Sequence, residues 1–292
     1  MARFGVARHA EWLTLYAAVQ GCYRDGWMPD SYYLEQVMPR VNGVSHHLAR
    51  VRATTPAFFD HPAICDLLYA LNGRFLRPDF SPLPPTEACD LLAGHGPDLV
   101  FKADQSGFGR GVQILSAADL SPERLLHLGN GVFQPKLSAH PELDGFGSRA
   151  LTTLRIGTAL TPDGRPEVRC CYLKIGRPGH AHVIARDQLR VAVDWHSGAL
   201  DEIGYLSDWH PVTCPPGVAT PFHGSAVPAI ADATHAAVSL HLQLPLAGYI
   251  CWDFAIDAEA RVRLLEWEGG VVGFAEAVQG PCFEHLDWVT AI

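Results

Sequence analysis

The feature that most constrains the fold is a set of apolar segments that occur in pairs, each pair joined by a short turn. Residues 153–160 and 167–175 flank a Pro-Asp-Gly turn, and residues 248–256 and 262–268 flank an Asp-Ala-Glu turn. Short turns join antiparallel strands, because a parallel pair needs a crossover connection of about a dozen residues or more. We therefore predict antiparallel sheet with segregated helices, which is an α+β fold and not a doubly wound parallel sheet.

Helical spacing dominates the N-terminal third of the chain. Residues 11–23 carry apolar side chains at helical intervals, and residues 60–71 repeat that pattern. Four prolines then interrupt regular structure between residues 77 and 85. We predict a mainly helical region over residues 1–85, and a short helix at 86–92 that opens the rest of the chain.

Charge and composition exclude several classes of protein. The net charge is −9, which argues against nucleic acid as the main partner. No apolar run reaches the roughly 18 residues of a membrane span, and the first residues lack a signal-like apolar core, so we expect no membrane partner and a cytoplasmic protein. The eight cysteines form no Cys-x-x-Cys pair, and the histidine pairs lack further ligands at zinc spacing.

Lysine is rare in this chain and marks a few particular positions. Of 22 basic residues only three are lysines: Lys102, Lys136 and Lys174. A lysine is a compact point charge that suits a phosphate oxygen, whereas arginine supplies the ordinary surface charge here. The alternative is that these are three unremarkable surface lysines.

A glycine-rich loop follows the strand that carries Lys102. Alternation over residues 98–103 places Leu99 and Phe101 on one face and Lys102 on the other. The loop allows backbone N–H groups to converge on an anion, and its residues are Ser106, Gly107, Phe108, Gly109, Arg110 and Gly111. It is neither a P-loop nor a dinucleotide fingerprint, because the lysine precedes the glycines and a strand follows them. The alternative is an ordinary glycine-containing hairpin turn.

Three carboxylates occur on the last predicted hairpin. Asp253 lies on its first strand, and Glu266 and Glu268 lie two residues apart on the second, so the two glutamates face the same side. Three converging carboxylates would repel one another unless a cation joins them, and oxygen-only ligands fit Mg²⁺ bridged to phosphates. The alternative is the solvated face of an edge strand.

Two cations occur on the preceding hairpin. Arg155 lies in the apolar strand 153–160, and Lys174 lies in its predicted partner strand. If both point into one cleft, they can hold a phosphate or a carboxylate. The alternative is a structural salt bridge.

The order of these motifs resembles the ATP-grasp superfamily over about residues 98–275. More narrowly, Phe-Gln-Pro-Lys-Leu-Ser-Ala-His-Pro-Glu-Leu at 133–143 and Leu-Thr-Thr-Leu-Arg at 151–155 resemble the sugar-transfer-associated ATP-grasp family. The resemblance implies an ATP-grasp fold, in which two α+β subdomains clasp ATP. Residues 86–135 would form the small subdomain with the glycine-rich loop, and residues 136–292 the large subdomain with the metal and phosphate site.

The resemblance also implies roles for individual residues. Lys102 would contact the α-phosphate and the adenine edge, and the loop at 106–111 would cover the other phosphates. Arg155 and Lys174 would be catalytic and face the transferred phosphate, and Asp253, Glu266 and Glu268 would hold Mg²⁺. The hinge that reads adenine would consist of Gln134, Pro135, Lys136 and Leu137.

The implied activity is an ATP- and Mg²⁺-dependent ligase that joins a carboxylate to an amine or thiol through an acyl phosphate, on a small molecule or a peptide. The alternatives are a small-molecule kinase on the same fold and a nucleotide-binding protein without catalysis. The chain departs from the family pattern in three ways. Glu268 and Thr152 each stand where the family has an asparagine, and no lysine precedes Lys102 in the chain. These departures leave the rate and the substrates open.

Overall fold

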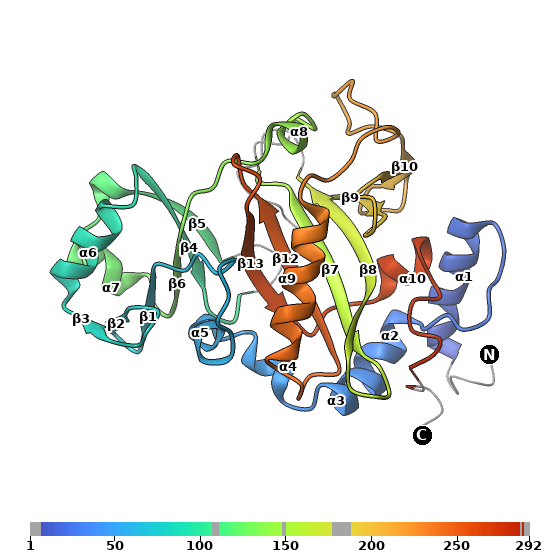
Figure 1. Cartoon of the computed structure of the whole chain (residues 1–292), viewed down its shortest axis with the longest axis horizontal. Helices are drawn as coiled ribbons and strands as arrows, with labels where there is room; N and C mark the ends of the chain where they lie inside the picture. Colours follow the sequence, from blue (N-terminus) through green and yellow to red (C-terminus); the bar gives the residue numbers. More distant parts are fainter. Residues whose placement is uncertain (1–6, 107–110, 148–149, 177–187, 287, 289–292) are drawn as a thin grey trace.

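The computed structural model describes residues 7–106, 111–147, 150–176, 188–286 and 288. It contains two antiparallel sheets with helices packed on them, side by side along the long axis of the molecule (Figure 1). The predicted α+β class is therefore confirmed. Among the described residues, no helix has both the length and the apolar character needed to cross a membrane.

The smaller sheet has six strands in the order β3-β2-β1-β6-β4-β5, with all neighbours antiparallel. Helices α6 (Pro85–Ala93) and α7 (Pro122–His127) cover one face, where Leu92 and Leu125 pack against Phe101 and Phe133. The strands are β1 (Leu68–Leu71), β2 (Arg74–Leu76), β3 (Pro82–Leu83), β4 (Asp98–Ala103), β5 (Val112–Ser116) and β6 (Gly131–Pro135).

The prediction of a helix over residues 60–71 is wrong. Residues 68–71 form β1, which lies between β2 and β6 in the middle of the small sheet. Leu68, Tyr69 and Ala70 are all buried, so this strand is apolar on both faces and does not alternate. A short apolar run of that kind cannot be distinguished from a buried helix by periodicity. Strands β1–β3 thus lie in the small sheet, although they precede residue 86.

The larger sheet has seven strands in the order β11-β10-β9-β8-β7-β12-β13, again antiparallel. Both predicted hairpins are present, as β7–β8 and β12–β13. Helix α9 (Ile230–Leu242) packs on one face. The strands are β7 (Thr153–Leu160), β8 (Pro166–Ile175), β9 (Leu189–Val193), β10 (Leu200–Tyr205), β11 (Pro211–Val212), β12 (Tyr249–Ile256) and β13 (Val262–Glu268).

The N-terminal helices cover the opposite face of the larger sheet, together with α10 (Gly273–Val278). Tyr16, Trp27 and Tyr33 are buried there against Tyr249 and Cys251 of β12. The remaining helical segments are η2 (Ala7–His9), α1 (Ala10–Gln20), α2 (Asp30–Tyr32), η3 (Tyr33–Val37), α3 (Met38–Val41), α4 (Ser45–Leu48), η4 (Arg52–Thr54), α5 (Thr55–Phe58), η5 (Ala117–Asp119) and α8 (Pro141–Asp144).

A buried polar network fixes α9 to the larger sheet. The Trp252 indole N–H donates to Thr158 Oγ1 at 2.8 Å, and that hydroxyl lies 2.7 Å from Nδ1 of His241. The other ring nitrogen of His241 lies 2.7 Å from the Ala247 carbonyl oxygen. Nε2–H therefore donates to Ala247, and Nδ1 accepts from Thr158, so the neutral imidazole satisfies every partner. Burial lowers the pKa of His241 to about 4, although the Ala247 carbonyl opposes the shift.

This network predicts a loss of stability in mild acid. The unfolded chain protonates His241 below about pH 6.5, whereas the folded protein holds it neutral until about pH 4, so stability is lost as pH falls between these values. We expect the free energy of unfolding of the wild type to fall by about 2 kcal/mol more than that of His241→Gln between pH 7 and pH 5. Urea denaturation at both pH values measures the difference. Parallel losses in the two proteins would contradict a buried neutral His241.

Candidate functional site

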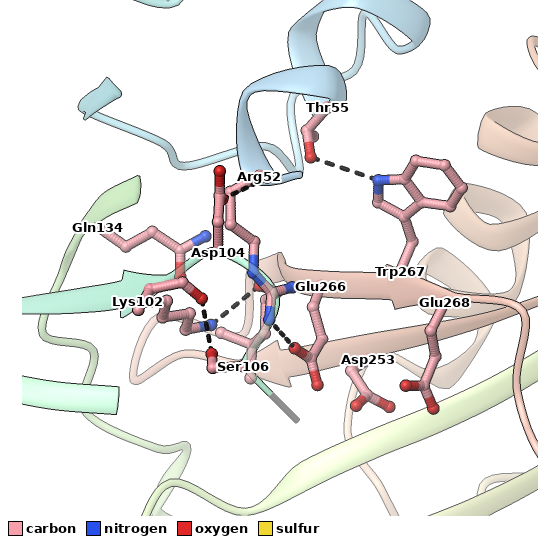
Figure 2. Close-up of polar contacts among 12 residues, drawn as sticks. Arg52, Thr55, Lys102, Asp104, Ser106, Gln134, Asp253, Glu266, Trp267 and Glu268 are labelled. Carbon is pink, nitrogen blue, oxygen red and sulfur yellow. Dashed lines mark hydrogen bonds and ion pairs between the residues drawn. The ribbon is translucent and has the colours of Figure 1, made fainter. Parts of the chain in front are cut away.

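The candidate site lies where the small sheet meets β13 of the large sheet (Figure 2). Lys102, on β4, reaches across, and its ammonium donates to the carbonyl oxygen of Leu265 on β13 at 2.9 Å. The predicted faces of β4 are confirmed, because Leu99 and Phe101 are fully buried in the small-sheet core. Burial lowers the pKa of Lys102, and the nearby Glu266 carboxylate opposes this. Lys102 therefore links the small sheet to β13 of the large sheet.

The glycine-rich loop begins with a tight turn. The Ser106 hydroxyl donates to the Ala103 carbonyl at 2.6 Å. A Cβ atom on Gly111 would lie only 2.2 Å from Ser106 Oγ, so the turn requires glycine there. The structure therefore places Ser106 and Gly111 beside the end of β4. The other four predicted loop residues, Gly107, Phe108, Gly109 and Arg110, lie outside the described residues.

Arg52 is a site residue that sequence reasoning missed. It lies in η4, and its guanidinium Nη2 is 2.9 Å from Glu266 Oε2 on β13. Its backbone N–H donates to the Asp104 carboxylate at 2.8 Å, so the same residue touches both sheets (Figure 2). No spacing rule connects Arg52 with residues so distant in sequence. The one signal in the sequence was that no lysine precedes Lys102, where the family pattern has one. Another basic residue therefore had to supply that positive charge.

The predicted hinge residues lie at the end of β6. The Gln134 side-chain amide donates to Asp66 at 2.5 Å, and the Tyr69 hydroxyl donates to the other Asp66 oxygen. Asp66 was also missed from sequence, and burial raises its pKa. This network holds the side chain of Gln134 inside the protein.

The chain leaves the small sheet directly after Gln134 and Pro135. Lys136 pairs with Asp98 at 2.8 Å and is partly exposed. Beyond Leu137, the His140 N–H donates to the Ile256 carbonyl at 3.0 Å, so the chain has joined the large sheet. Residues 136–139 thus connect the two sheets, which is where a hinge between subdomains would lie.

The three predicted carboxylates are neighbours, but the chain's own cations neutralise them. Asp253 lies opposite Glu266 in the β12–β13 pair. Arg155 binds Asp253 with two hydrogen bonds, from Nε at 2.7 Å and from Nη2 at 2.8 Å, and its Nη1 lies 2.6 Å from Glu268. Lys174 donates to the same Asp253 oxygen as Nη2. The cation expected to join these carboxylates is thus supplied by side chains of the protein, and no metal is needed to offset their repulsion.

The electrostatics of this cluster follow from its burial. Burial alone would raise the pKa of Asp253, but the Arg155 guanidinium and the Lys174 ammonium hold it well below its usual range. Burial likewise acts to lower the pKa of Arg155, and Asp253 and Glu268 together raise it above its ordinary value. Arg155 and Lys174 therefore do form structural salt bridges, which was the alternative interpretation of these two residues. These salt bridges lie within the candidate site itself.

The donor set fits a divalent cation at two of the three carboxylates. Both oxygens of Asp253 are bound by cations, and the side chain is almost completely buried. Glu266 and Glu268 each use one oxygen for an ion pair and are partly exposed, at 31% and 43% of the side chain. Within the part of the chain that the structure describes, no group of three His, Cys, Asp or Glu side chains is arranged as a complete metal site. Substrate phosphates would have to supply further ligands.

The comparison with known protein families identifies the chain as an ATP-grasp protein. The model of the sugar-transfer-associated ATP-grasp family matches residues 127–279, which is more than half of the chain. The chain therefore belongs to the sugar-transfer-associated ATP-grasp family, and the resemblance noted in its motifs is confirmed. No curated protein sequence matches the chain.

Solved structures of ATP-grasp proteins are distant from this chain in sequence. This chain is similar to the ATP-grasp ligase PsnB complexed with a minimal precursor, at 14% sequence identity and a TM-score of 0.49. The match covers 86% of this chain and 63% of PsnB. For biotin carboxylase from Campylobacter jejuni, the sequence identity is 10% and the TM-score is 0.47. That match covers 94% of this chain and 50% of the biotin carboxylase chain. This chain spans less than two thirds of the length of either protein.

The cluster predicts unequal effects of two similar substitutions. Asp253→Asn leaves Arg155 and Lys174 buried without their main counter-charge, so we expect it to lower the free energy of unfolding by about 3 kcal/mol. Glu268→Gln removes a partly exposed partner of the same Arg155, and we expect a loss of less than about 1 kcal/mol. Urea denaturation without nucleotide or metal measures both. Losses of equal size would contradict the central place of Asp253.

Proposed function

We propose that the chain binds Mg·ATP between its two sheets and uses it to join a small-molecule carboxylate to an amine or thiol. The observation that supports this most is the meeting of cations from both sheets at β13. Lys102 arrives from the small sheet, while Arg155 and Lys174 lie on the large sheet and bind Asp253, and Arg155 also pairs with Glu268. Positive groups next to partly exposed carboxylates suit a metal-bound polyphosphate.

In this proposal adenine lies against the hinge formed by Gln134, Pro135, Lys136 and Leu137. The side chain of Gln134 is held away by Asp66, which leaves backbone groups of the hinge to read the base. Lys102 and the loop that starts at Ser106 then lie beside the phosphates. Arg52 supplies a further cation on this side of the cleft, through its place beside Glu266.

Glu266 and Glu268 are the residues that would hold Mg²⁺, and Asp253 lies opposite Glu266 on the neighbouring strand. When bound, the metal would neutralise negative charge on the phosphates during transfer. Glu268 replaces the asparagine of the family pattern, and its ion pair with Arg155 offsets the additional negative charge.

The chemistry requires positioning more than covalent participation by the protein. A carboxylate oxygen of the substrate attacks the γ-phosphorus, ADP leaves, and an acyl phosphate results. The amine or thiol then attacks the acyl carbon, and inorganic phosphate leaves. Arg155 is the candidate catalytic group on the transferred phosphoryl, because its five N–H donors exceed the three used by Asp253 and Glu268. Lys174 lies beside it with donors beyond its bond to Asp253.

Lys102→Arg should weaken nucleotide binding. Lys102 fills a partly buried position that spans to Leu265, and the larger planar guanidinium cannot contact phosphate as a compact point charge. We expect the affinity for Mg·ATP to fall about tenfold, which corresponds to ~1.4 kcal/mol. Calorimetry measures the affinity, and a thermal melt without nucleotide checks that the variant is folded. An unchanged affinity would remove Lys102 from the nucleotide site.

Magnesium should act through Glu266. We expect ATP with Mg²⁺ to raise the melting temperature of the wild type more than ATP with a chelator, and we expect Glu266→Ala to lose this difference. Glu259→Ala is the matched control, since Glu259 lies in the exposed turn after β12 and, among the described residues, forms its ion pair with Arg261. If the Glu266→Ala and Glu259→Ala variants keep the same magnesium effect, Glu266 is not a ligand.

The reaction itself is tested with a panel of small acids, ATP, Mg²⁺ and hydroxylamine. Hydroxylamine converts an acyl phosphate into a hydroxamate, so a ligase gives ADP, phosphate and hydroxamate in equal amounts. ADP with a phosphorylated alcohol product would favour the kinase alternative instead. Nucleotide binding without ADP formation across the panel would favour the non-catalytic alternative.

A further inference from the structure

A third cation lies on the same face of the large sheet, one strand beyond Lys174. Arg190 on β9 is directly opposite Lys174 on β8, and Lys174 is opposite Thr153 on β7. Arg155 is two residues from Thr153 and therefore shares its face. The three cations Arg155, Lys174 and Arg190 thus occupy one side of three adjacent strands. The phosphate site proposed above involves the first two only.

Aromatic rings surround the Arg190 head group. Its Cζ atom lies 5.0 Å from the ring centroid of Trp209 and 4.7 Å from that of Phe274. Those two rings stack at 6.0 Å, and Tyr172 packs against Phe274 at 4.7 Å. The rings come from the β10–β11 turn, α10 and β8, so three separate elements build these walls. Phe274 is buried, whereas Trp209 is partly exposed and borders solvent.

The backbone at Trp209 is held in an uncommon conformation. Its φ angle is +69°, in the left-handed region that a bulky side chain rarely adopts. Hydrogen bonds across the turn fix this geometry, from Trp209 N–H to the Leu206 carbonyl at 2.9 Å and from Leu206 N–H to His210 at 3.0 Å. The turn therefore holds the indole against Arg190 at some cost in backbone strain.

Arg190 has no counter-charge of its own in the described part of the chain. Its Nε has no hydrogen-bond partner there, and no described carboxylate forms an ion pair with it. The acidic groups that act on it electrostatically are the Tyr172 phenol and, more weakly, Asp30, and one Asp30 oxygen already accepts from the N–H groups of Val272 and Gly273, at 2.7 and 2.8 Å. A largely buried guanidinium whose Nε has no hydrogen-bond partner among the described residues is unfavourable, and a bound anion would relieve that cost.

We propose that Arg190, Trp209 and Phe274 form a binding site for the carboxylate of an organic acid that carries a flat or apolar body. The planar guanidinium fork matches a carboxylate, and the rings provide apolar surface beside it. Because Lys174 is the cross-strand neighbour of Arg190, the bound acid lies next to the proposed phosphoryl site. The inference rests on the proposed function for its role as the acid site, but binding of the anion requires no ATP.

Calorimetry with benzoate, in the absence of nucleotide and metal, tests the site. Benzamide has the same shape without the charge, so we expect benzoate to bind the wild type and benzamide not to compete with it. Arg190→Gln should weaken benzoate binding about tenfold or more, the size of a lost charged hydrogen bond. Arg165→Gln is the matched control, because Arg165 lies in the exposed turn between β7 and β8, and it should bind benzoate like the wild type.

Stability gives a second readout that a purely structural Arg190 would not produce. Benzoate should raise the melting temperature of the wild type and not that of Arg190→Gln, whereas a purely structural Arg190 predicts the same shift in both proteins. Arg190→Lys keeps the charge without the fork and should bind benzoate more weakly than the wild type. It serves as the test variant if Arg190→Gln does not fold.

Three results would overturn the proposal: no benzoate binding to the wild type, equal affinities for benzoate and benzamide, or equal benzoate affinity in wild type and Arg190→Gln. Calorimetry with Mg·ATP separates this site from the nucleotide site, since Arg190→Gln should bind ATP like the wild type. Benzoate binding that depends on Arg190, in a protein that fails to bind Mg·ATP, would support this site and contradict the proposed function.

Discussion

The ion pair between Arg155 and Asp253 is the interaction on which the rest of the site depends. Both side chains are almost completely buried on neighbouring strands β7 and β12 of the large sheet. A buried charge is tolerated only when it is paired and hydrogen-bonded, and here two bonds join the pair while Lys174 and Glu268 extend it. The positions of these four side chains are therefore set together, and the remaining donors of Arg155 and Lys174 are held in fixed places.

The second constraint is the contact between the two sheets at β13. This strand is an edge of the large sheet, and an exposed edge offers unpaired backbone groups to other chains. Lys102 satisfies one such carbonyl, at Leu265, and Arg52 pairs with Glu266 on the same strand. The Ala63 carbonyl accepts from the Leu264 N–H, so backbone and side chains together cover this edge. In the proposed function, the same two cations lie beside the nucleotide.

Strand alternation accounts for the site residues that could be predicted from sequence. Lys102 faces away from the small-sheet core, Asp253 lies opposite Glu266, and Arg155 and Lys174 lie on paired strands, because each follows from period-two geometry across a short hairpin. β1 was missed because a central strand buried on both faces shows no alternation. Arg52 and Asp66 were missed because they meet the site through contacts between segments that are remote in the chain.

The sequence by itself determined the antiparallel hairpins, the family, and the set of side chains available for phosphate and metal. Local patterns suffice for these, since turns and strand periodicity act over a few residues. Only the tertiary structure decided how the charges are paired. The same three carboxylates that suggested a bare metal cluster are bound by Arg52, Arg155 and Lys174, while Arg190 is left against aromatic rings without a described counter-charge. Which charges pair depends on distances of a few ångströms between segments that are far apart in the chain. Burial then strengthens the electrostatic energy of each pair, because the dielectric constant of the interior is low.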